Sequence, residues 1–145
     1  MNKEDMMKGR GLVKGIAEGE ALVSRESLVW SHGVDPETGK IDDVRVSVCG
    51  QCVKDKILIY PLGKGSTSGA TWMLEAVRCG NGPKAIINKE TELIIVAGAV
   101  LSEKLYEKAI PVVDRLDKDP TEVISTGDIV RVDGEKGTVE IIKRG

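Results

Sequence analysis

The sequence has no phenylalanine, and its two tryptophans and two tyrosines make aromatic residues only 3% of the 145-residue chain. Proteins that bind single-stranded nucleic acid stack bases on aromatic side chains, and this chain has almost none to offer. An excess of basic residues is absent too, since 21 lysines and arginines are mixed with 23 acidic residues for a net charge of −2. We therefore expect no nucleic-acid partner.

Long apolar runs are also absent. The N-terminus, MNKEDMMKGRG, alternates charged residues with methionine and lacks the apolar core of a signal peptide. No later run approaches the roughly 20 residues of a membrane span. We expect a cytoplasmic protein without a membrane partner. A chain of this length suits one domain over residues 1–145, with residues 1–9 as a flexible N-terminal extension.

Cysteine is scarce, and its number is odd. Cys49 and Cys52 form a C-x-x-C pair, and Cys79 stands apart, so a disulfide framework is not expected. A tetrahedral metal site would need two more ligands, for which only Cys79 and His32 are available. The surrounding VRVSVCGQCVKDK alternates like a strand that runs into a turn, unlike the helix start of a redox pair. We expect no metal site in this chain, and a redox role of the pair stays open.

The first third of the chain has a pattern typical of antiparallel strands. Short apolar runs in GLVKGIAEGEALVSR are interrupted by Gly15 and Gly19, as in strands with bulges or tight bends. The segment SHGVDPETGKI has the proline and glycines of a turn. Residues 44–48 follow with valines at alternate positions, which predicts a half-buried strand.

From residue 56 the pattern predicts alternating strands and helices. Buried strands are expected over 56–61, 83–89 and 110–116, and helices over 68–82 and 91–106. The second helix is expected to be buried, because it is apolar nearly all round. The tail over 126–142 has a hairpin signal around DGEKG. The fold class predicted is α/β, in three layers: an antiparallel sheet, a parallel sheet and covering helices.

The stretch PLGKGSTSGA, residues 61–70, joins the first buried strand to the first helix. In a parallel sheet this position collects ligands, because unpaired N–H groups and the helix dipole favour negative charge. The stretch fits no Walker loop, since Gly69 is followed by Ala70, and it misses the dinucleotide fingerprint by one residue. A nucleophile elbow would select Thr67, with only the remote His32 as a base. From the residues alone, a structural helix cap, an anion-binding loop and a catalytic serine all remain open.

The order and spacing of several motifs nevertheless resemble a known family. GRGLVKGIAEGEALVS, GVDPETGKI, PLGKGSTSGA, GAVLSEKLYEKAIPVVDRL and GDIVRVDGEKGTVEI together resemble the swivel-domain small subunits of the aconitase X family. The resemblance implies a swivelling β/β/α fold. It also implies a heterodimer in which a large catalytic subunit binds a 4Fe-4S cluster, and this chain does not.

The resemblance implies a dehydration at residues 64–68. By analogy with the swivel-domain serine of aconitase-like enzymes, Ser66 is the catalytic proton acceptor, and Lys64, Gly65, Thr67 and Ser68 are substrate-binding. The implied substrate is a phosphorylated hydroxy acid, (R)-5-phosphomevalonate, which loses water to give trans-anhydromevalonate 5-phosphate on an archaeal mevalonate route to isoprenoids. Aconitase has an arginine where this chain has Ser68, so Lys64 is expected to take part of its role.

Two other functions remain open at this point. A related dehydratase could act on a different hydroxy acid, such as hydroxyproline, or the chain could be a non-catalytic anion-binding module. Asp114 is interpreted as the end of a buried strand and not as a site residue. Nothing in the sequence marks His32 as catalytic.

Overall fold

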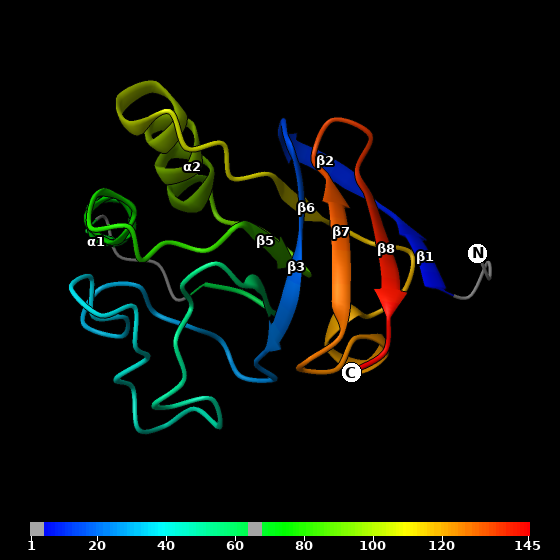
Figure 1. Cartoon of the computed structure of the whole chain (residues 1–145), viewed down its shortest axis with the longest axis horizontal. Helices are drawn as coiled ribbons and strands as arrows, with labels where there is room; N and C mark the ends of the chain where they lie inside the picture. The colour runs from blue at the N-terminus through cyan, green and yellow to red at the C-terminus, as the bar shows by residue number, and fades with distance from the viewer. Residues whose placement is uncertain (1–4, 64–67) are drawn as a thin grey trace.

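The computed structural model describes residues 5–63 and 68–145 (Figure 1). The strands are β1 (Met6–Lys8), β2 (Arg10–Val13), β3 (Ile16–Val23), β4 (Ile57–Tyr60), β5 (Ala85–Asn88), β6 (Val112–Asp114), β7 (Ile129–Asp133) and β8 (Thr138–Lys143). The helices are α1 (Gly69–Arg78), α2 (Leu93–Tyr106) and the short α3 (Pro120–Val123). The expected strands and helices beyond residue 56 are thus confirmed, as is the C-terminal hairpin.

The strands follow the order β1-β8-β7-β3-β4-β5-β6-β2. β3 links two sheets, because residues 16–20 pair antiparallel with β7 and residues 21–23 pair parallel with β4. β4, β5 and β6 continue the parallel part. α1 and α2 lie on one side of these strands, and β7 and β8 lie on the other (Figure 1). The predicted three-layer α/β architecture is confirmed.

Two apolar cores lie on the two faces of the parallel strands. All four side chains of β4 are buried, and successive side chains point to opposite faces. Leu58 and Tyr60 belong to the core shared with the helices. Ile57 and Ile59 belong to the core shared with the antiparallel strands. A strand buried on both faces must be apolar throughout, which explains the continuous run ILIY.

The first described residues form strands at the two ends of the strand order instead of a free extension. β1 and β2 are consecutive in the chain but lie at opposite ends of the strand order, so the chain crosses between the sheets at Gly9. The Gly9 N–H donates to the carbonyl of Gly137 at 2.8 Å. Our expectation of a flexible extension over residues 1–9 is wrong for Met6–Lys8, because Met7 is fully buried in the second core.

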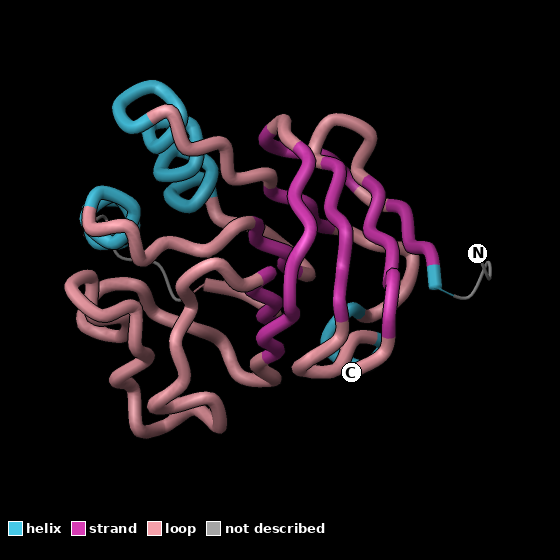
Figure 2. Tube along the Cα trace, viewed as in Figure 1, coloured by secondary structure: helices cyan, strands magenta, loops and turns pink. Residues whose placement is uncertain are grey.

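Residues 24–56 form a long irregular segment beside α1, on the helix side of the sheet (Figure 2). The strand expected over residues 44–48 is wrong, since these residues lie in bends and turns. Val46 and Val48 are buried, as the alternation required, but Val44 is 86% exposed. A loop packed on a helix can bury alternate valines as well as a strand does. The turns expected around residues 31–41 and at Gly50 are present.

α2 is only partly buried, which corrects the prediction of an all-round buried helix. Ile95, Ala99 and Ser102 face the interior, whereas Leu93 is 85% exposed and Leu105 is 60% exposed. The apolar residues of α2 therefore lie on two faces of the helix, and the rest of the chain buries only one of these faces. In the part of the chain that the structure describes, no helix has the length and apolar character to span a membrane.

Candidate functional site

The candidate site lies at the carboxyl edge of the parallel strands. The chain leaves β4 after Tyr60, passes Gly63 and enters α1 after Ser68. Ser68 is therefore the one predicted site residue that the structure describes. The other four, Lys64, Gly65, Ser66 and Thr67, lie outside the described residues. The described part of the site consists of the flanking residues Gly63 and Ser68 and of the nearby edge of the sheet.

Gly63 is held on two sides. It forms an isolated parallel bridge with Leu28, which lies in the long segment after β3. On its other side, a Cβ added at Gly63 would lie 3.2 Å from Oε2 of Glu92, the residue just before α2. A larger side chain at position 63 would therefore have to displace that carboxylate. The entry to the loop is thus a close approach that a glycine allows.

Ser68 occupies the N-cap position of α1, but its side chain does not cap the helix. Its hydroxyl oxygen instead lies 2.5 Å from the hydroxyl oxygen of Ser31. The alternative of a side-chain cap is therefore wrong for Ser68, and a contact with substrate stays a prediction. The first turn of α1 has no acidic residue, so no side chain of that turn offsets the positive end of the helix dipole.

A polar network ties the strand ends together below this loop. Asn88 donates to the carbonyl of Tyr60 at 3.0 Å and accepts from the hydroxyl of Thr91 at 3.1 Å. The Thr91 N–H donates to Asp114 at 2.9 Å, and Arg10 binds the same carboxylate with two hydrogen bonds of 2.9 and 2.8 Å. Adjacent strand ends are thereby fixed relative to one another.

Asp114 is the charged centre of this network. Burial of its carboxyl acts to raise the pKa, but the hydrogen bonds from Arg10 and Thr91 outweigh burial, and the pKa is held below its ordinary value. Asp114 is fully buried and its carboxylate is occupied by these partners. Its position at the end of β6 agrees with the structural interpretation made from the sequence.

Further cations at this edge are also paired with carboxylates. Lys89 Nζ lies 2.8 Å from Asp119, and Arg115 forms two hydrogen bonds with Glu90. Arg10 reaches Glu90 as well, at 3.6 Å. An anionic ligand at the edge would therefore compete with existing ion pairs for these three cations.

Sequence reasoning missed the residues before His32 that contact the loop and α1. Trp30 is buried and donates from Nε1 to the hydroxyl of Tyr60 at 3.3 Å. Burial raises the pKa of Tyr60 to about 12, so its hydroxyl stays protonated. His32 packs on Trp72 of α1, with ring centroids 4.6 Å apart. The only signal in the sequence was the local WSHG turn, and the residues of α1 that it contacts are about forty positions further along the chain.

Four of the eight residues that line the 590 Å³ cavity beside His32 and Trp72 are acidic, and none is a lysine or arginine. Asp35 uses one oxygen to accept the N–H of Glu37 at 2.9 Å, and Glu75 pairs with Arg78. This cavity adjoins the first turns of α1 but carries the wrong charge for a phosphorylated acid.

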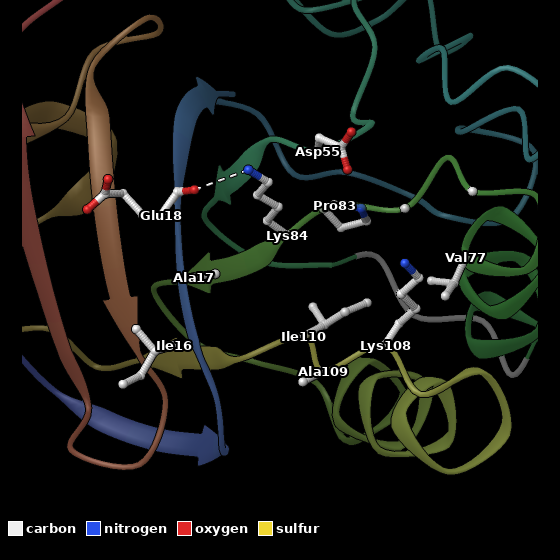
Figure 3. Close-up of a pocket in the computed structure, with 12 residues that line it drawn as sticks. Ile16, Ala17, Glu18, Asp55, Val77, Pro83, Lys84, Lys108, Ala109 and Ile110 are labelled. Atoms are coloured by element: carbon white, nitrogen blue, oxygen red, sulfur yellow. Dashed lines mark hydrogen bonds between the residues drawn. The ribbon is translucent and has the colours of Figure 1, made fainter.

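A second cavity, of 440 Å³, lies at the opposite, amino edge of the parallel strands (Figure 3). It is lined by the start of β3 and by the segments that precede β4, β5 and β6. Lys84 donates from Nζ to the carbonyl of Glu18 at 3.3 Å, and Lys108 lines the cavity from the segment after α2. Both helices end near this edge, and cationic side chains there complement the negative ends of the helices. Ser68, the predicted site residue that the structure describes, does not line this cavity.

The structure describes all three cysteines, as free thiols. Cys49 is exposed, and Cys52 donates from its sulfur to the carbonyl of Thr38 at 3.3 Å. Among the described residues, no three His, Cys, Asp or Glu side chains gather closely enough to hold a metal ion. This part of the chain therefore offers no ligand set for an iron-sulfur cluster.

Comparison with known proteins gives consistent matches. The model of the aconitase X swivel domain matches residues 6–141. A protein of Methanosarcina acetivorans named phosphomevalonate dehydratase small subunit is 44% identical over 137 residues, 94% of this chain and 91% of the relative. The protein of that name from Pyrococcus furiosus is 45% identical over 139 residues, 96% and 97% of the two chains. The crystal structure of holo aconitase X from Thermococcus kodakaraensis matches with a TM-score of 0.86 and 43% identity, over 95% of this chain and 98% of the other.

Proposed function

Because this chain belongs to the aconitase X swivel-domain family, we propose that it is the small subunit of a hydro-lyase that dehydrates (R)-5-phosphomevalonate to trans-anhydromevalonate 5-phosphate. The observation that carries the proposal is the 44% identity with a phosphomevalonate dehydratase small subunit over 94% of this chain and 91% of the other. The reaction belongs to a mevalonate route to isoprenoids. A cytoplasmic location suits such a metabolic enzyme.

The activity requires a large subunit, as the name of the relatives implies. We assign the 4Fe-4S cluster to that subunit, since the described residues of this chain offer no ligand set for it. The two chains form a heterodimer, and the carboxyl edge of β4 faces the substrate. The isolated small subunit is expected to be inactive.

In this proposal Ser66 removes the proton from C2 of the substrate. A serine hydroxyl is a poor base at neutral pH, so its alkoxide form needs nearby donors and exclusion of water. α1, which begins directly after Ser68, supplies the positive end of a ten-residue helix whose first turn carries no acidic side chain. Lys64 adds a positive charge beside the base, and Gly65, Thr67 and Ser68 bind the substrate. Contact with the large subunit excludes water from the loop.

The test is reconstitution with the large subunit under anaerobic conditions with iron, followed by a dehydration assay on 5-phosphomevalonate. Ser66→Ala should lower kcat by about 10³-fold or more, because the proton acceptor is lost, while the complex still assembles. Ser125→Ala is the matched control, because Ser125 is an exposed serine after α3 and is not one of the predicted site residues.

Three outcomes would count against the proposal. Near-normal turnover of Ser66→Ala would overturn the assignment of the base. Dehydration of another hydroxy acid, such as hydroxyproline, in preference to 5-phosphomevalonate would overturn the substrate. A complex that binds phosphomevalonate without converting it would favour an anion-binding module.

A further inference from the structure

We infer that Ser31 is a positioning residue for the reaction, because it belongs to a short segment that holds both ends of the 64–67 loop. This segment, residues 28–31, we term the bracket. The inference rests on the proposed function, since it assigns a consequence to the placement of Ser66. Ser31 itself acts through Ser68 and is given no contact with substrate.

The bracket contacts the two residues that flank the loop. Leu28, which is buried, pairs with Gly63 at the end that leaves β4. Ser31 lies 2.5 Å, hydroxyl to hydroxyl, from Ser68 at the end that enters α1. Four residues lie between Gly63 and Ser68, and the five steps from one Cα to the other could span up to about 17 Å if extended. The contacts of Leu28 with Gly63 and of Ser31 with Ser68 help to define the distance between these two flanking residues.

The bracket is itself anchored to the parallel sheet. Trp30 donates to the hydroxyl of Tyr60, the last residue of β4, and both side chains are buried. A Cβ added at Gly69 would lie 3.9 Å from Cβ of Trp30, which is ordinary van der Waals contact. The indole thus fills the space between the end of β4 and the start of α1.

The chain after the bracket turns tightly and returns to α1. The N–H of Gly33 donates to the carbonyl of Trp30 at 3.3 Å. A Cβ at Gly33 would lie 1.9 Å from the carbonyl oxygen of Val29, so only glycine fits there. His32 has φ +60°, a left-handed conformation that is rare for residues other than glycine, and its ring packs on Trp72. The turn therefore presents Ser31 to Ser68 in one defined orientation.

Ser66 lies between Gly63 and Ser68 in the sequence, so a contact that fixes either flanking residue affects the placement of its hydroxyl. A base is effective only within hydrogen-bond reach of the proton it removes, and a displacement of about 1 Å can cost roughly 10²-fold in rate. Loss of the Ser31 hydroxyl removes its contact with Ser68 while Gly63 stays paired with Leu28. The effect should fall on kcat through the displaced base, and KM should rise to a smaller extent through the substrate contacts of the loop, because the substrate contacts of the large subunit are untouched.

The test compares Ser31→Ala, Ser31→Thr and Ser102→Ala in the reconstituted complex. Ser31→Ala should lower kcat about 10- to 100-fold with a smaller change in KM, and Ser31→Thr, which keeps a hydroxyl, should restore most of it. Ser102 is a suitable control because it is a buried serine whose hydroxyl donates within α2, to the carbonyl of Gly98 at 2.8 Å. Ser102→Ala should leave kcat near that of the wild type. A kcat of Ser31→Ala within twofold of wild type would overturn the inference.

A double-mutant cycle separates the Ser31–Ser68 contact from other effects. If Ser31 acts through Ser68, Ser31→Ala should cost little further kcat in a Ser68→Ala background. Full additivity of the two changes would contradict the inference. Normal kcat in Ser68→Ala alone would contradict it too, and this variant serves where Ser31→Ala reduces the yield of the complex.

Amide hydrogen exchange of the full chain distinguishes failure of this inference from failure of the proposed function. Ser31→Ala should speed exchange in peptides that cover residues 63–72, relative to wild type and to Ser102→Ala. That result supports the positioning role even for a complex inactive on 5-phosphomevalonate. If the wild-type complex is active and Ser31→Ala exchanges at the wild-type rate, the positioning role is overturned and the dehydratase proposal stays intact.

Discussion

Replacing Asp114 with asparagine should destabilise the chain strongly, because this buried carboxylate joins three segments at the site edge. It accepts hydrogen bonds of 2.9 and 2.8 Å from Arg10, at the start of β2, and one of 2.9 Å from the N–H of Thr91. Asparagine keeps the shape of the side chain and removes its charge. Its amide nitrogen is a donor, and it would face either Arg10 or the Thr91 N–H, which are donors themselves.

The size of the effect follows from the burial of the two partners. Removal of one partner of a buried ion pair costs about 3–5 kcal/mol. The carboxyl of Asp114 is fully buried, but the side chain of Arg10 is 41% exposed and can be hydrated once it loses its partner. We therefore expect the low end, about 3 kcal/mol, which lowers the thermal midpoint of a chain of this size by roughly 9 °C.

Thermal unfolding of Asp114→Asn and wild type, followed by circular dichroism between pH 7 and pH 3, measures this. The folded-state pKa of Asp114 is depressed, so its stabilisation is complete above the ordinary carboxyl pKa of about 4 and disappears as the pH falls through the lower folded value. The difference between the proteins should therefore be largest near neutrality and shrink below pH 4. Glu75→Gln, which breaks an exposed pair with Arg78, should barely move the midpoint. A shift for Asp114→Asn as small as for Glu75→Gln would refute the reasoning, and so would a difference that grows in acid.

Two further predictions concern the fold. Gly9→Ala should lower the free energy of unfolding by about 1–3 kcal/mol or more, because the new Cβ would lie 2.3 Å from a backbone carbonyl oxygen. Gly19→Ala should be tolerated, because its Cβ would meet mainly a flexible lysine side chain at 3.2 Å. Equal urea midpoints for the two variants would contradict this prediction. Asp128→Asn should make the stability of the fold less sensitive to acid. Burial acts to raise the pKa of Asp128, but two backbone N–H groups and Arg144 hold this pKa below its ordinary value. The stabilisation from Asp128 is therefore present above about pH 4 and is lost in acid. An unchanged pH profile of unfolding would contradict that assignment.

The elements that the sequence predicted correctly are those whose signal is local. β4 is apolar throughout, and β5 and β6 are apolar except for their last residues, Asn88 and Asp114. All three strands are buried on both faces, between the helices and the antiparallel strands, as such apolar runs predict. α1 ends before Gly80, which falls within the predicted range 68–82 and adopts φ +79°, a conformation that glycine takes readily at a helix end. Fold class and element order follow from signals of this kind.

The elements predicted wrongly depend on distant partners. β1 has three residues and exists because β8 offers an edge about 130 positions away in the chain. The exposed side of α2 also carries large apolar residues, namely Leu93, Val100, Leu101 and Leu105, so periodicity could not show which residues the fold covers. The candidate loop was recognised from its local sequence. Ser31, which contacts it across 37 positions, carried no local signal.

The wrong prediction over residues 44–48 has a structural reason connected with the site. Segments of this length without regular structure are uncommon in compact domains and usually serve a function. Glu26 holds this one together by accepting the N–H of Ser47 at 3.1 Å and its hydroxyl at 3.0 Å. Burial acts to raise the pKa of Glu26, but these hydrogen bonds lower it overall, so the carboxylate stays charged and bonded. The same irregular segment begins with the bracket, whose residues contact Gly63 and Ser68, and after the turn at Gly33 it continues beside α1, where His32 packs on Trp72.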